Sequence, residues 1–392
     1  MLSALSLMES LLRTTTDMSP KWQQAFVSFF TFLISLFVIC DIQTIFDLAS
    51  CTKIFSTTTA VAYLYERGLI DINALVTKYL PDFGQQGKSG LTIRNLLLHN
   101  SGLPPDPLTS FASVEFGCPE TTKKSPQLSF SCSDKCYNGV MSSTVQRKPN
   151  QVYVYSDINF MTLMYVVGQI VKDNNLISVC DIRGDCSLNQ AGWRQCYFEA
   201  FVRKMFQETF HLNHTMYLPG KSTWGVIAPT ENRTTTDFRH RCLQGEVHDE
   251  NCFSMGGVSG HAGLFSDIDD TMALMRAWLY PEQYANGAFS SKTTVLFTTV
   301  ANLSQSSRAL GWNTNADVPD YGFQNSCGTL SHETFMHTGY TGPVICADPK
   351  RKIGAIFLCN RVYPDRSSSG AYIDHRMDFF TEVQKLWDAQ TR

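Results

Sequence analysis

The chain has 392 residues, a net charge of -3 and a pI of about 6.3. This length suits one large domain or two subdomains that share a core, and the lack of a basic stretch argues against nucleic acid as a partner. Hydrophobic residues make up 43% and charged residues 17% of the chain, which is typical of a well-packed globular protein.

The first feature along the chain is an apolar run, Ala25 to Cys40, that contains no charged residue. It is short for a bilayer span of about 20 residues, but Trp22 and the polar flank lengthen it. We expect an N-terminal segment, 1–43, with a signal anchor over about 23–40. The remaining domain, 44–392, would then lie on the lumenal or extracellular side. A buried core helix is the alternative, in a secreted or cytosolic protein.

Cysteines and glycosylation sequons favour the same compartment. The chain has 13 cysteines, many of them in its middle third, and Asn-x-Ser/Thr sequons begin at Asn213, Asn232 and Asn302. We therefore predict disulfide bonds and a glycoprotein, because disulfides persist in the secretory pathway and outside the cell. Free thiols in a cytosolic protein are the alternative. A zinc site on Cys132 and Cys136 is disfavoured, because no convincing second pair follows.

The next elements are helical. In "FDLASCTKIFSTTTAVAYLYERG", Asp47 is a candidate N-cap for a helix over about Ala49–Arg67, and Gly68 is its stop signal. "LTIRNLLLHNSGLPPD", Leu91 to Asp106, predicts a helix that runs into a Gly-Pro loop. Residues 107–150 have little periodicity and indicate a long irregular insertion tied by disulfides.

The second half changes from helices to strands. A loop at Tyr155 leads into a helix from about Asn159, and a Gly-rich loop precedes a helix capped near Ser266 or Asp267. "TFMHTG", "GPVICADP" and "KIGAIFLCN" are short β-rich runs separated by turn residues, as in an antiparallel sheet. A last amphipathic helix covers about Tyr372–Ala389. We predict an α+β fold, with an antiparallel sheet flanked by helices and a separate, mainly helical lobe.

Ser50 and Lys53 suggest chemistry at the start of the first long helix. Residues three apart on a helix share one face, so the two side chains should be adjacent. A serine hydroxyl is a poor nucleophile without a base, and a desolvated lysine whose pKa falls can serve as that base. A Ser-x-x-Lys pattern also arises by chance, as a capping serine with a surface lysine.

Several motifs in order make the chain resemble a known family. They are "FDLASCTK", "LTIRNLLLHNSGLP", "YVYSDINF", "GEVHDENCFSMGGVSGHAGLFS" and "HTGYTG". In this order and spacing they resemble the serine β-lactamase-like hydrolases, nearest to class C β-lactamases, DD-peptidases and related esterases. The resemblance covers the chain from about Thr44 to the C-terminus, and it implies the β-lactamase/transpeptidase-like fold.

The resemblance also implies a role for each matched residue. Ser50 matches the acylated nucleophile, Lys53 its proton acceptor, and Tyr155 a second acid/base. The other matched positions belong to substrate binding and are Asp157, His337, Thr338, Gly339 and Tyr340. Backbone N–H groups of Ser50 and Tyr340 would form the oxyanion hole. The implied reaction is acyl transfer from a small-molecule or peptide ester or amide, and it needs no cofactor and no metal.

Two residues depart from the β-lactamase pattern. His337 stands where class C enzymes carry lysine, and a histidine that is mostly neutral at pH 7 holds a substrate carboxylate less strongly. Asp157 stands in place of an asparagine, and a carboxylate cannot donate a hydrogen bond to a substrate carbonyl. Both changes favour an esterase or peptidase over a β-lactamase. They also leave open a catalytically weak, membrane-tethered protein that uses the fold for binding.

Other polar residues have simpler interpretations. We expect His261 to fix its loop, Glu246 and Asp249 to anchor the Gly-rich loop, and Cys51 to pack. A metal cluster at 248–250 is disfavoured, because adjacent side chains rarely face one ion. In relatives a helix and two strands precede the nucleophile helix. The apolar run occupies that place here, so we expect either a sheet without those strands or an N-terminus of different origin.

Overall fold

The computed structural model describes residues 42–118, 131–234, 238–317, 326–368 and 372–391. The strands are β1 Phe46–Asp47, β2 Met216–Tyr217, β3 Glu231–Asn232, β4 Cys242–Leu243, β5 Leu264–Ser266, β6 Asn313–Thr314, β7 Phe335–Thr338, β8 Val344–Asp348 and β9 Ile353–Phe357. The α-helices are α2 Thr59–Glu66, α3 Ile93–Leu97, α5 Ser133–Met141, α6 Asp157–Asp173, α7 Trp193–Lys204, α8 Glu250–Ser254, α9 Ile268–Leu279, α10 Pro281–Tyr284, α11 Ser291–Thr298 and α12 Tyr372–Gln390.

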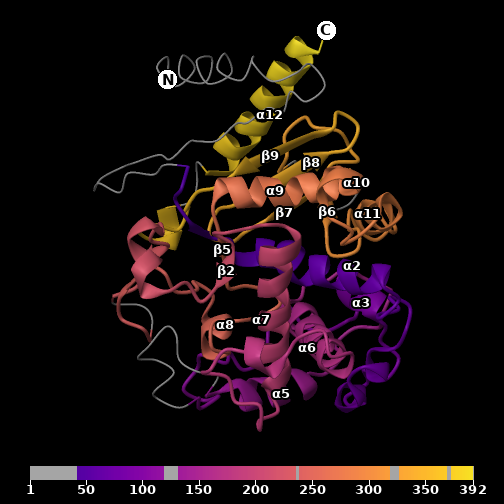
Figure 1. Cartoon of the computed structure of the whole chain (residues 1–392), viewed down its shortest axis with the longest axis vertical. Coiled ribbons are helices and arrows are strands. Elements are labelled where there is room, and N and C mark those ends of the chain that lie inside the picture. Colours follow the sequence, from indigo (N-terminus) through magenta and orange to yellow (C-terminus); the bar gives the residue numbers. More distant parts are fainter. Residues whose placement is uncertain (1–41, 119–130, 235–237, 318–325, 369–371, 392) are drawn as a thin grey trace.

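The main sheet is antiparallel, with strand order β6-β7-β8-β9. Its side chains alternate between two cores, as a pleated strand requires. On β8, Ile345 packs with α9, whereas Val344 and Cys346 pack with Phe380 of α12. Helices therefore cover both faces of the sheet, with α9 and α10 across one and α12 on the other (Figure 1).

A helical lobe made of α3, α5, α6 and α7 lies at the other end of the molecule (Figure 1). Its central helices, α6 and α7, approach each other closely at Gly168. A Cβ atom there would lie 1.9 Å from the carbonyl oxygen of Arg194, so only glycine fits. This close contact fixes the position of α6, and therefore that of its first residue, Asp157.

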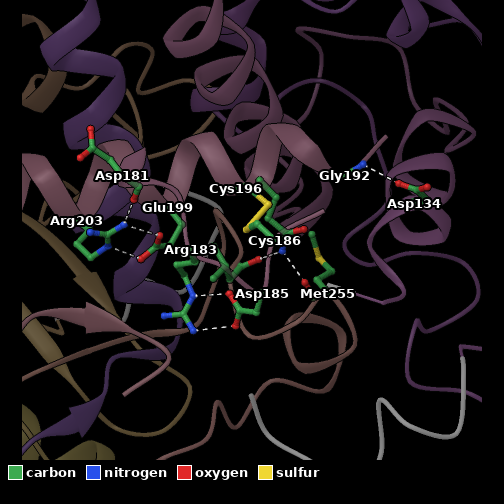
Figure 2. The surroundings of a disulfide bond; sticks show 12 residues. Asp134, Asp181, Arg183, Asp185, Cys186, Gly192, Cys196, Glu199, Arg203 and Met255 are labelled. Carbon is green, nitrogen blue, oxygen red and sulfur yellow. Dashed lines mark hydrogen bonds and ion pairs between the residues drawn. A yellow bond between two sulfur atoms is a disulfide. The ribbon is translucent and has the colours of Figure 1, made fainter. Parts of the chain in front are cut away.

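The lobe also carries a disulfide, Cys186–Cys196, that joins the 174–192 loop to α7 (Figure 2). The adjacent residue on α7, Gln195, is fully buried, and its amide donates to the carbonyl oxygens of Met255 and Val258. Helix α7, which the disulfide joins to the 174–192 loop, therefore supports the Gly-rich loop, residues 255–263, through these two hydrogen bonds.

The sequence predicts the fold class correctly but simplifies the first long helix. The α+β arrangement of sheet and helical lobe is confirmed. The expected α-helix over 49–67 is instead a 3-10 turn at Ala49–Cys51, a π-helix at Lys53–Thr58 and then α2. The wider π turn occurs where Lys53 must meet three partners at once, and such turns are frequent at functional sites.

Three disulfides lie in the described part of the chain, namely Cys118–Cys132, Cys186–Cys196 and Cys327–Cys346. The first pair ties the predicted insertion, which also contains α5. Because Cys132 pairs with Cys118, it is not a zinc ligand. The expected anchor at about 23–40 falls within 1–41, outside the described residues. The same holds for the place where the first strands of relatives would lie, so that expectation stays a prediction.

Candidate active site

Ser50 lies at a sharp turn between β1 and the π-helix. The residue before it, Ala49, has a φ of 44°, in the left-handed region that a residue with a Cβ seldom adopts. The following residue, Cys51, is fully buried, and its thiol contacts the carbonyl oxygen of His337 on β7. Cys51 therefore packs as expected, and the turn holds Ser50 at the wall of a cavity.

Lys53 is completely buried, and its ammonium group contacts three partners. It lies 3.0 Å from Ser50 Oγ, 3.1 Å from the carbonyl oxygen of His261 and 2.7 Å from a carboxylate oxygen of Asp157. The ring centre of Tyr155 is 4.8 Å from the same nitrogen. The adjacency expected of Ser50 and Lys53 is therefore present, and Asp157 pairs with the lysine directly.

The charge on Lys53 differs from the sequence expectation. Burial by itself lowers its pKa, but the Asp157 carboxylate and then the Tyr155 phenol outweigh burial and raise the pKa above the usual lysine value. The lowered pKa that serine activation requires of the lysine is therefore not present in the resting site. Lys53 is a cation here, and it donates its hydrogen bond to Ser50.

Tyr155 lies in the turn that leads into α6, and the loop after α3 positions this turn. His99 accepts a hydrogen bond from the backbone N–H of Ser156 through Nδ1 at 3.0 Å, and its carbonyl oxygen accepts from Val154 N–H. Its imidazole also packs on the Tyr155 ring, with centroids 4.5 Å apart. Burial raises the pKa of Tyr155, although Lys53 opposes this effect, so the phenol keeps its proton.

The last residues of β7, beyond its pairing with β6, form another part of the cavity wall. His337 is buried on β7, and its Nδ1–H donates to the carbonyl oxygen of Thr338 at 2.9 Å. Gly339 follows the strand, and a Cβ there would lie 2.6 Å from the carbonyl oxygen of Leu48. Only glycine therefore lets the strand approach the Ser50 turn this closely.

Arg308 is a site residue that the sequence motifs do not indicate. It lies in the coil between α11 and β6, and its guanidinium donates to His337 Nε2 at 3.3 Å. Burial, then Arg308 and Lys53, lower the pKa of His337 well below 6.5, so the imidazole is neutral. The positive charge beside the strand is thus carried by Arg308, while His337 is neutral, as expected.

These groups line a cavity of about 470 Å³. Its lining residues are Ser50, Tyr153, Tyr155, Arg308, His337, Thr338, Gly339, Tyr340, Arg361 and Arg376. The structure thus brings seven of the eight predicted site residues to one place, either lining the cavity or, for Lys53, in contact with Ser50. The eighth, Asp157, reaches the site through Lys53. The three arginines stand outside the motifs, and no pattern in the sequence marks them. Tyr153 is the first residue of the motif "YVYSDINF", which gave it no role.

The Gly-rich loop is fixed by His261, as expected. Its Nδ1 is 2.7 Å from Ser259 Oγ and its Nε2 is 3.0 Å from Asp249. Burial would raise the pKa of Asp249, but His261 and a backbone N–H hold it well below its usual range. Glu246 instead binds Arg241.

Two groups of side chains could be compared with metal sites. Ligand atoms of Asp157, Asp249 and His261 lie within 4.8 Å of one another, but the Lys53 ammonium already neutralises Asp157 and would repel a cation. At 248–250 the side chains are already engaged by different partners, since His248 binds Glu231, Asp249 binds His261 and Glu250 binds Arg366. This geometry gives no support for a metal ion in either group.

Comparison with known proteins identifies the family. A family profile described as Beta-lactamase matches residues 40–174 and 197–376. The chain is also 30% identical over 345 residues to a putative D-alanyl-D-alanine carboxypeptidase of Salmonella agona, an alignment that covers 83% of this chain and 71% of that protein. The chain belongs to the β-lactamase family. It is a serine hydrolase of the β-lactamase-related type.

Solved structures of other proteins share this fold. A class C β-lactamase from Rhodobacter sphaeroides has a TM-score of 0.56 at 18% identity, over 88% of this chain and 87% of that one. A penicillin-binding protein homologue from Caulobacter crescentus has a TM-score of 0.58 at 15% identity, over 88% and 84%. Within the described residues, no helix is both long and apolar enough to cross a bilayer.

The neutral state of His337 predicts a pH dependence of stability. As pH falls below about 6.5, an unfolded histidine takes up a proton while buried His337 does not, so the unfolded state binds more protons. The folded state therefore loses stability on acidification. In His337→Gln this contribution is absent, so the fall in Tm between pH 7 and pH 5 should be smaller, as measured by thermal unfolding.

His332→Gln is the matched control, because the His332 side chain is 70% exposed. An equal fall in Tm for wild type and His337→Gln would contradict the assignment of a neutral imidazole to His337.

Proposed function

We propose that the protein forms an acyl-enzyme on Ser50 and hydrolyses an ester or amide that carries a carboxylate, as an esterase or peptidase rather than a β-lactamase. The contact that carries this proposal is the 3.0 Å distance between Lys53 Nζ and Ser50 Oγ at the wall of the cavity. A buried lysine at this distance from a serine hydroxyl is the arrangement that serine activation requires.

The proton path follows from the charge on Lys53. Its proton must leave before it can accept one from Ser50, and Asp157 is 2.7 Å away to receive it. A bound substrate excludes water, and an ion pair without water is less stable relative to its neutral form. Transfer to Asp157 then leaves a neutral lysine that accepts the Ser50 proton. Tyr155, which keeps its proton, donates it to the leaving group.

The backbone provides the oxyanion hole in this proposal. Within the described part of the chain, the N–H groups of Ser50 and Tyr340 donate no hydrogen bond. Both belong to residues that line the cavity, so they are available to the oxygen of a tetrahedral intermediate. One lost donor of this type typically reduces kcat by about 10²–10³-fold.

The charges in the cavity indicate the substrate class. Arg308 lies beside neutral His337, with its guanidinium 5.3 Å from the Tyr153 ring centre and 5.2 Å from that of Tyr155. An arginine presents a planar fork that matches a carboxylate. A peptide with a C-terminal carboxylate has this group beside its scissile bond. The carboxypeptidase name of the Salmonella relative agrees with this class.

Activity-based labelling tests the nucleophile. Full-length protein should react covalently with a fluorophosphonate probe, and Ser50→Ala should not react, because the only activated hydroxyl of the proposal is removed. Hydrolysis of a p-nitrophenyl ester should fall by on the order of 10³-fold or more.

Ser259→Ala is a matched control, because Ser259 binds His261 and does not line the cavity. Equal labelling of wild type and Ser50→Ala, or none in folded wild type, would favour the alternative of a catalytically inactive binding protein.

The role of Arg308 predicts a charge-selective loss. Arg308→Gln should lower kcat/KM for 3-acetoxybenzoate by about ten- to a hundredfold, the effect of one lost charged hydrogen-bond pair. Phenyl acetate, which lacks the carboxylate, should be affected far less. Arg94→Gln is the control, because Arg94 lines a neighbouring cavity and binds Asn73. Equal losses for both esters would refute carboxylate recognition by Arg308.

We further propose that this domain is lumenal or extracellular, tethered by the apolar run at about 23–40. The three disulfides support an oxidising compartment, and the sequon residues Asn213, Asn232 and Asn302 are all exposed. Carbonate extraction should leave the protein in the membrane pellet, and a glycosidase should lower its mass. Replacement of the three asparagines by glutamine should abolish the mass change. A soluble product with no such change would overturn the proposal.

A further inference from the structure

Asp47, on β1, makes an unusual set of contacts just before the nucleophile. Its side chain is fully buried, and its two carboxylate oxygens accept from two different segments. Oδ1 accepts from Ala49 N–H at 2.8 Å, and Oδ2 accepts from His248 N–H at 2.7 Å. The first contact is one residue before Ser50. It holds Ala49 in the left-handed conformation that costs energy in a residue with a Cβ.

The main chain of Asp47 makes a third contact, with the other side of the oxyanion hole. Its carbonyl oxygen accepts from Thr341 Oγ1 at 2.8 Å, and Thr341 directly follows Tyr340. Asp47 is therefore hydrogen-bonded to Ala49, the residue before Ser50, and to Thr341, the residue after Tyr340. These are the two residues whose N–H groups would hold the oxyanion.

A fourth link runs through His248. Its backbone is fixed by Asp47, and its imidazole stacks on the Tyr340 ring, with centroids 5.7 Å apart and planes inclined by 29°. The imidazole is fixed in turn by Glu231, 2.7 Å from its Nε2. Asp47 thus restrains the main chain next to Tyr340 through Thr341 and the Tyr340 ring through His248.

We propose that Asp47 is a positioning residue that sets the separation and direction of the Ser50 and Tyr340 N–H groups. Asp47 does not line the cavity, so it acts on the reaction only through these two segments. This inference rests on the proposed acyl-enzyme function. A shift of about 1 Å in such a group can cost on the order of 10²-fold in rate.

Asp47→Asn is the decisive variant. It preserves the side-chain shape, but one oxygen becomes an NH₂ group that faces an N–H donor, so one of the two hydrogen bonds is lost. We expect kcat for a p-nitrophenyl ester and the limiting rate of fluorophosphonate labelling to fall about ten- to a hundredfold. KM should change less than threefold, because the substrate-binding side chains are untouched.

Asp267→Asn is the matched control for loss of stability. Asp267 is equally a buried aspartate that accepts from a backbone N–H, that of Asp270 at the start of α9, but it lies outside the cavity lining. Asp267 Oδ2 also pairs with His214 Nδ1, so Asp267→Asn should lower Tm by weakening this contact, and it should leave the labelling rate within about twofold of wild type. A loss of rate in Asp47→Asn no larger than in Asp267→Asn would overturn the inference.

Thr341 provides a second pair of variants if Asp47→Asn fails to fold. Thr341→Val removes the hydroxyl that binds Asp47 and keeps the shape, whereas Thr341→Ser keeps the hydroxyl. If Thr341→Val lowers kcat and Thr341→Ser keeps the wild-type value, the inference is supported. Equal kcat values for the two variants would overturn it. The proposed function fails separately, since labelling would then be absent from wild type or unchanged in Ser50→Ala.

Discussion

The site depends on one buried cation. Lys53 has no exposed surface, and removal of one partner from a buried ion pair costs about 3–5 kcal/mol, because the other charge stays buried. Asp157, Ser50 and the His261 carbonyl are therefore structural requirements as much as chemical ones. They come from α6, the Ser50 turn and the Gly-rich loop, so the lysine joins the helical lobe to the segment that precedes the sheet.

The same constraint explains the charges around the cavity. A second buried cation at position 337 would lie close to Lys53, whereas a neutral histidine can accept a hydrogen bond from an arginine further out. The cation proposed to meet the substrate is thus separated from the cation that faces the proposed nucleophile. Asp157, which replaces an asparagine of the β-lactamase pattern, balances the charge of Lys53, and in the proposed mechanism it accepts the lysine's proton.

The sequence predicted what depends on short motifs and missed what depends on packing. Ser50, Lys53, Tyr155 and the strand at His337 carry local patterns, and their order along the chain identifies the family and hence the fold. Arg308 enters the cavity from an irregular coil, where neither periodicity nor spacing distinguishes it from a surface arginine. The high pKa of Lys53 could not be predicted either. The direction of the pKa shift of Lys53 depends on the 2.7 Å distance between its ammonium group and Asp157, 104 positions further along the chain. A sequence does not contain that distance.

The position of Arg308 separates two properties of the protein. The groups proposed for bond cleavage lie on the Ser50 turn, α6 and the sheet edge, which are tied together by buried bonds. Arg308 lies instead on the coil between α11 and β6, which is itself held in the core, since Leu310 and Trp312 are buried and Gly311 N–H donates to the carbonyl oxygen of Leu97. Replacement of the Arg308 side chain alone could thus change which acyl donor is accepted, while the groups proposed for cleavage stay in place.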